Sequence, residues 1–178
     1  MADTRVQLEV EDWVRQEWMP TKYGVTFNRD RVKLRSGGVF DFDAVSGDKS
    51  IIATISTSGA KTAGGNYAVG KMLKIRSDML FLTMVEAQQR VVLTAQDMYK
   101  QCHKEKEGGR VPQEIEFVHA SLPEKLNARL VAARQKASVE SGGASQWPWT
   151  WCDEVAILRS TGNRYCRDKR PDSETRLT

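Results

Sequence analysis

The sequence predicts an α/β fold of the mixed α+β kind, in which one mixed central sheet is flanked by helices. Three observations support this fold class. The chain opens with apolar residues at helical spacing, three β-rich runs follow across glycine-containing turns, and helical and strand patterns then alternate up to residue 140. We therefore expect residues 1–140 to form one domain and residues 141–178 to form a partly polar tail that contains tryptophans.

The opening helix is predicted over residues 4–18. Val6, Val10, Val14 and Trp18 recur at intervals of four residues, which places them on one helix face. Pro20 follows two residues later and is expected to end the helix, because proline lacks the backbone N–H that a helix interior needs.

Three strands are predicted next, over residues 31–36, 38–45 and 50–57. The short segments between these strands contain the glycine and aspartate residues that are typical of hairpin turns, so the strands should form an antiparallel meander. The remaining pattern predicts a helix, two strands, a helix, a strand and a last helix, over residues 66–77, 79–85, 90–95, 97–107, 114–120 and 121–139.

Composition excludes several classes of protein. The chain has 178 residues, a net charge of +4, three cysteines and two histidines. So few cysteines and histidines favour neither a disulfide framework nor a zinc site. No run approaches the roughly 18–20 apolar residues of a membrane span, and the start lacks a secretory pattern. We expect a cytoplasmic protein that does not bind membranes.

Positive charge is concentrated in the first half of the domain. Residues 20–76 carry ten basic and four acidic side chains, whereas residues 77–140 carry nine of each. Clustered Lys and Arg favour a polyanion, because each contact with a phosphate releases a counterion. The expected partner is therefore a nucleic acid, DNA in the first instance. A solvated surface explains the same charges as an alternative, and the tryptophan-containing tail also suits homodimer formation.

A polar cluster is expected where the second and third strands pair. Asp41 and Asp43 share one face of the second strand, because successive side chains alternate between faces. Thr54 and Ser56 share a face of the third strand, and Thr54 lies eleven residues after Asp43. An aspartate that bonds turn amides is the alternative reading of Asp43.

This layout resembles the core of the restriction-endonuclease-like superfamily, the PD-(D/E)xK nucleases, over roughly residues 5–120. In that family an aspartate on the second strand and an acidic-x-lysine tripeptide on the third carry the chemistry. Asp43 matches the aspartate, whereas Thr54 and Ser56 occupy the acidic and lysine positions of the tripeptide. The resemblance implies a restriction-endonuclease-like core and Mg²⁺-dependent cleavage of phosphodiester bonds in nucleic acid.

The groups missing from the tripeptide are sought among neighbouring residues. Asp43, Asp41 and Glu17 are the candidate metal ligands, because Mg²⁺ prefers hard oxygen ligands and Glu17 falls within the apolar stripe of the opening helix. Glu9 lies at the edge of that stripe. Lys71 is the preferred source of positive charge at the scissile phosphate, so Asp43 and Lys71 are the candidate catalytic residues, with Lys61 as the second lysine.

Four basic residues are the candidate contacts to nucleic acid: Lys61, Lys71, Lys74 and Arg76. A solvated helix face and loop explain them equally well. Two functions therefore remain open. One is an Mg²⁺-dependent endonuclease with a rearranged active site, and the other is a catalytically inactive nucleic-acid-binding or protein-interaction module on the same fold.

Overall fold

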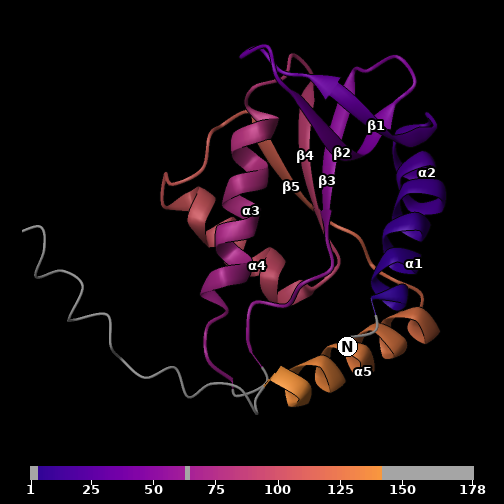
Figure 1. Ribbon diagram of the computed structural model, residues 1–178, viewed down its shortest axis with the longest axis vertical. Helices are drawn as coiled ribbons and strands as arrows, with labels where there is room; N and C mark the ends of the chain where they lie inside the picture. Colours follow the sequence, from indigo (N-terminus) through magenta and orange to yellow (C-terminus); the bar gives the residue numbers. More distant parts are fainter. Residues whose placement is uncertain (1–3, 63–64, 142–178) are drawn as a thin grey trace, which may run out of the picture. The chain divides into compact units, whose positions relative to one another are not determined.

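The computed structural model describes residues 4–62 and 65–141. They form a five-stranded mixed sheet with helices on both faces, which confirms the predicted fold class (Figure 1). The strands lie in the order β1-β2-β3-β4-β5. Their bounds are β1 (Phe27–Lys33), β2 (Val39–Ser46), β3 (Ile51–Ser56), β4 (Gln88–Leu93) and β5 (Ile115–His119). The predicted tail lies outside the described residues from position 142 onwards.

The first three strands pair in an antiparallel manner, as predicted, whereas β3, β4 and β5 are parallel. Parallel neighbours need a crossover, and helices supply both crossovers here. The helices are α1 (Arg5–Trp13), the π-helical segment η1 (Val14–Trp18), α2 (Met19–Tyr23), α3 (Val69–Leu82), α4 (Gln96–Glu107) and α5 (Glu124–Ser141). No described helix has both the length and the apolar character of a membrane span.

The sheet separates two apolar cores. One lies under α3 and α4 and includes Phe42, Ile52 and Ile75, whereas the other lies under α1 and α5 and includes Ala53 and Leu130. Figure 1 shows α3 and α4 on one face of the sheet and α1 on the opposite face. Because Ile52 and Ala53 are successive residues of β3, they face opposite cores, as a strand with two buried faces requires.

The predicted end of the first helix at Pro20 is wrong. The helical chain continues through η1 into α2 and ends at Gly24, which has a left-handed φ of 72°. Pro20 lies in the first turn of α2, where a missing backbone N–H is tolerated. The helical chain is therefore about one turn longer than predicted.

The predicted strand over residues 79–85 is also wrong, because α3 continues to Leu82. Met72, Ile75, Met79 and Leu82 are buried and recur at helical spacing against the sheet. A short apolar run does not by itself distinguish a strand from a buried helix end, and here the helical period continues through it.

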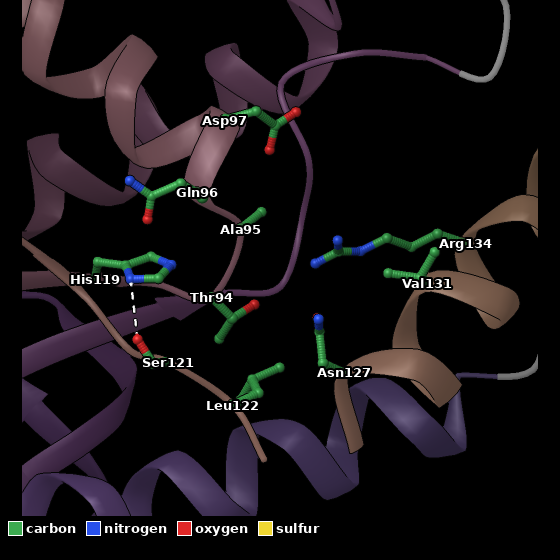
Figure 2. A pocket seen from close by; sticks show the side chains of 10 residues that line it. All are labelled: Thr94, Ala95, Gln96, Asp97, His119, Ser121, Leu122, Asn127, Val131 and Arg134. Atoms are coloured by element: carbon green, nitrogen blue, oxygen red, sulfur yellow. Dashed lines mark hydrogen bonds between the residues drawn. The ribbon is translucent and has the colours of Figure 1, made fainter. Parts of the chain in front are cut away.

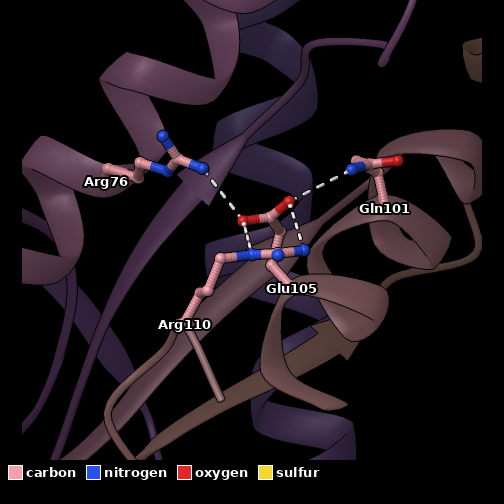
Figure 3. A network of polar contacts seen from close by, with 4 residues as sticks. All are labelled: Arg76, Gln101, Glu105 and Arg110. Carbon is pink, nitrogen blue, oxygen red and sulfur yellow. Dashed lines mark hydrogen bonds and ion pairs between the residues drawn. The ribbon is translucent and has the colours of Figure 1, made fainter. Parts of the chain in front are cut away.

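Glu105 of α4 centres a polar network that joins α4 to α3 and to the loop after α4 (Figure 3). Its carboxylate accepts hydrogen bonds from Arg76 at 2.9 Å, from Arg110 at 3.0 Å and from Gln101 at 3.4 Å. The bonds from Arg76 and Arg110 lower the pKa of the Glu105 carboxyl group. Since the Glu105 side chain is only 11% exposed, the network fixes α4 against α3.

We expect Glu105→Gln to lower the free energy of unfolding at pH 7 by about 1–3 kcal/mol, because the hydrogen bonds from Arg76 and Arg110 lose their carboxylate charge while both arginines stay partly solvated. Because the Glu105 carboxyl group has a lower pKa in the folded than in the unfolded protein, it stabilises the fold at pH values above the ordinary glutamate pKa of about 4.3. This contribution is lost as the pH falls through the lower pKa of the folded state. The difference between wild type and variant should therefore shrink below about pH 4. Urea unfolding at several pH values measures it, and a difference independent of pH would contradict the network.

Candidate functional site

A β-bulge changes the direction of the second strand at Asp43. Between the pairs Asn28 with Val45 and Asp30 with Phe42, β1 advances by two residues and β2 by three. Phe42 consequently faces the core under α3 and α4, while Ala44 faces the core under α1 and α5. The simple alternation that places Asp41 and Asp43 on one face is therefore interrupted here. Bulges of this kind often re-aim a side chain next to a functional site.

The Asp43 carboxylate takes the place of a backbone partner for β3. Its Oδ2 accepts a hydrogen bond of 2.9 Å from the amide of Ile55. Backbone pairing between β2 and β3 is confined to Ala44 with Ala53 and Val45 with Ile52. The side chain of Asp43 therefore lies at the point where these two strands part.

Arg15 of η1 holds the bulge against the N-terminal helix. Its Nε donates to the backbone carbonyl of Asp43 at 2.6 Å, and its Nη1 lies 2.6 Å from Oδ1 of Asp12. The Arg15 side chain is only 11% exposed. The position of Asp43 is thus fixed both by β3 and by the helix that covers this face of the sheet.

Glu11 is a partly buried carboxylate of α1 that feels the charge of Asp43. Burial, and next the negative charge of Asp43, raise the pKa of the Glu11 carboxyl group. The charges of Arg15, Arg29 and Lys74 oppose this effect. Two carboxylates that repel each other in partly buried positions form an arrangement that a bound cation would relieve.

Asp78 and Lys74 reach the same region from α3, on the other face of the sheet. Lys74 Nζ lies 2.8 Å from Oδ2 of Asp78. Burial and the charge of Asp43 raise the pKa of the Asp78 carboxyl group, while Lys74 lowers it. We call Glu11, Asp43, Lys74 and Asp78 the Asp43 cluster. It combines three carboxylates and one ammonium group from α1, β2 and α3.

The other predicted carboxylates occupy different surroundings. Asp41 is exposed and forms an ion pair with Arg31, whose Nε lies 3.0 Å from Oδ1 of Asp41. Glu9 forms an ion pair with Arg129 of α5 at 2.6 Å. Glu17 is exposed on η1.

The basic residues that were predicted to contact nucleic acid also lie in different parts of the structure. Lys74 joins the Asp43 cluster, whereas Arg76 belongs to the network around Glu105. Lys61 is exposed in the loop after β3, and Lys71 is half-buried in the first turn of α3. Of the predicted site residues, Asp43 thus acts electrostatically on Glu11 and Asp78, which the sequence did not single out, and Lys74 is paired with Asp78.

Thr54 and Ser56 lie on β3 as predicted. Thr54 is buried, and its hydroxyl group has no hydrogen-bond partner within the described structure. Ser56 is half-buried, and its Oγ accepts a bond of 3.4 Å from the Ser58 amide. Neither residue carries a charge next to Asp43.

No group of three His, Cys, Asp or Glu side chains in the described part of the chain is arranged to hold a metal ion. Mg²⁺, however, retains several waters and is commonly held by one or two carboxylates together with substrate phosphates. The repelling pair of Glu11 and Asp43 fits that more open mode of binding. A preformed, fully coordinated metal site does not fit the residues present.

Comparisons with protein families, with curated proteins and with solved structures gave no match to this chain. The case for a function therefore depends on the chain's own residues and topology.

The Asp43 carboxylate should contribute to stability through the Ile55 amide as well as through its charge. Asn retains an oxygen that can accept the bond, whereas Ala leaves a buried donor unpaired. We expect Asp43→Ala to be less stable than Asp43→Asn by about 1–3 kcal/mol.

Denaturant unfolding of the two variants at pH 7 measures this difference. Both variants remove the charge, so its repulsion of Glu11 and Asp78 cancels in the comparison. Equal stabilities would contradict the role of the Ile55 hydrogen bond.

Proposed function

We propose that this protein cleaves phosphodiester bonds in nucleic acid, DNA in the first instance, in a divalent-cation-dependent reaction at the Asp43 cluster. The observation that carries the proposal is the position of Asp43. A bulge re-aims it to the point where β2 and β3 part, and carboxylates from α1 and α3 interact with it there. The resemblance to restriction-endonuclease-like nucleases supports the same reading.

Glu11 and Asp43 are the residues that would hold Mg²⁺, whose chemistry is to polarise a phosphate oxygen and to lower the pKa of a bound water. Lys74 supplies positive charge for the phosphate in the transition state. Asp78 positions that ammonium group through the 2.8 Å ion pair. Arg29 adds a further positive charge near Glu11 and attracts the nucleic-acid backbone.

Two carboxylates bind Mg²⁺ weakly unless substrate phosphates complete its coordination. The proposal therefore includes a dependence of metal affinity on nucleic acid.

A specific observation favours a second candidate, which is a nucleic-acid-binding module that does not cleave. Thr54 occupies the place of the family's acidic residue, is buried and has an unpaired hydroxyl group among the described residues. Without a carboxylate at position 54, the site would keep its basic residues for binding nucleic acid but would not hold a metal ion.

The test compares Glu11→Gln, Asp43→Asn and Lys74→Ala with Glu17→Gln and Lys71→Ala. The first three alter the Asp43 cluster, and the last two alter neighbouring residues with the same chemistry. Cleavage of duplex and single-stranded DNA and RNA is measured with Mg²⁺ and with Mn²⁺. We expect the Glu11 and Asp43 variants to lose cleavage, and Lys74→Ala to reduce kcat by about 10²–10³-fold.

Glu17→Gln and Lys71→Ala should keep most of the activity. Loss of cleavage in those two variants but not in the first three would reassign the site to the residues predicted from the sequence. Absence of cleavage by the wild type, with salt-dependent binding to nucleic acid retained, would favour the second candidate. Absence of binding at low salt would overturn both functions.

A further inference from the structure

A cavity lies at the carboxyl ends of the parallel strands, outside the Asp43 cluster. It has a volume of about 370 Å³ and opens where β4 and β5 end, between the start of α4 and the side of α5 (Figure 2). Its volume falls within the range of small-molecule sites. In α/β sheets, ligands commonly bind beyond the carboxyl ends of parallel strands.

Polar side chains enter this cavity from opposite sides. Figure 2 shows His119, at the end of β5, on one side, with Arg134 and Asn127 of α5 on the other. Ser121 Oγ lies 3.5 Å from Nδ1 of His119, and Figure 2 shows the second ring nitrogen turned towards the cavity. In the tautomer in which Nδ1 accepts the Ser121 hydroxyl proton, Nε2 carries the ring proton and can donate into the cavity.

The Arg134 guanidinium is fixed in place by a hydrogen bond to the carbonyl of Thr57, just after β3. Burial lowers the pKa of Arg134, and the charge of Asp97 opposes this effect. A cation held in a partly buried position is stabilised by a neighbouring anion.

Asp97 is the carboxylate at the rim of the cavity, and its oxygens are already engaged. Oδ2 accepts a bond of 2.8 Å from the Ala60 amide, and Oδ1 accepts one of 2.9 Å from the Met98 amide. Two amide donors disperse its negative charge, so Asp97 opposes an incoming anion less than a free carboxylate would. The cavity as a whole is lined by the guanidinium group of Arg134, the amide group of Asn127 and the imidazole ring of His119.

We propose that this cavity binds a phosphate monoester. These polar groups lie on β5 and on α5, so they approach from different directions and can contact more than one oxygen of a tetrahedral phosphate group. Such a group occurs both in a mononucleotide and at the phosphorylated end of a nucleic-acid strand. The proposal is independent of the cleavage reaction at the Asp43 cluster, because it uses different residues.

Calorimetric titration of the full chain tests the proposal with five probes: inorganic phosphate, adenosine monophosphate, acetate, and one oligonucleotide both with and without a 5′-phosphate. The variants are Asn127→Ala and His119→Ala. Arg129→Ala is the matched control, since it removes an arginine from the same helix that pairs with Glu9. Thermal unfolding of each variant identifies any that fails to fold.

We expect binding of adenosine monophosphate or a preference for the 5′-phosphorylated oligonucleotide, weakened at least tenfold by Asn127→Ala and by His119→Ala but not by Arg129→Ala. Binding of the mononucleotide identifies a free nucleotide as the source. A preference for the phosphorylated oligonucleotide alone identifies the strand end. The proposal is overturned if no phosphate probe binds, if acetate binds equally well, or if the folded Asn127 and His119 variants bind like wild type.

Discussion

The hydrogen bond between the Ile55 amide and the Asp43 carboxylate is the interaction on which this site depends. Without it, a buried strand would have an unpaired donor where β2 and β3 part. The bond makes an acidic side chain a structural part of the sheet. The surrounding helices then bring Glu11 and the pair of Lys74 and Asp78 towards that fixed charge. A structural requirement of the sheet and the proposed site thus coincide at one aspartate.

Much of the fold follows from local pattern. The glycine-containing turns predict the antiparallel meander, and the alternation of helices and strands predicts the mixed sheet, because both signals are confined to a few neighbouring residues. The end of α3 and the continuation of the first helix past Pro20 do not follow in this way. The end of α3 is decided by the packing of Met79 and Leu82 against the sheet. The continuation of the first helix past Pro20 follows a π-helical turn, which the sequence pattern does not predict.

The site is less accessible to prediction because it depends on a bulge. The alternation of side chains along β2 identifies Asp43 as a candidate. It cannot reveal the extra residue of the bulge that changes the direction of the Asp43 side chain, because the bulge depends on how β2 pairs with β1. Glu11 had a usable signal, because it precedes Val14 by three residues and Trp18 by seven and so shares their helix face. The pairing of Lys74 with Asp78 is visible as an i, i+4 spacing. Their approach to Asp43 requires the tertiary fold.

The most direct test of the Asp43 cluster is the pKa of the Glu11 carboxyl group, measured by ¹³C NMR titration in the wild type and in Asp43→Asn. In the wild type we expect this pKa above the ordinary value for glutamate, because Glu11 is partly buried and faces a second carboxylate. Removing the charge of Asp43 should lower it. A Glu11 pKa that is ordinary in the wild type and unchanged in the variant would contradict the cluster, and with it the proposed site of phosphodiester cleavage.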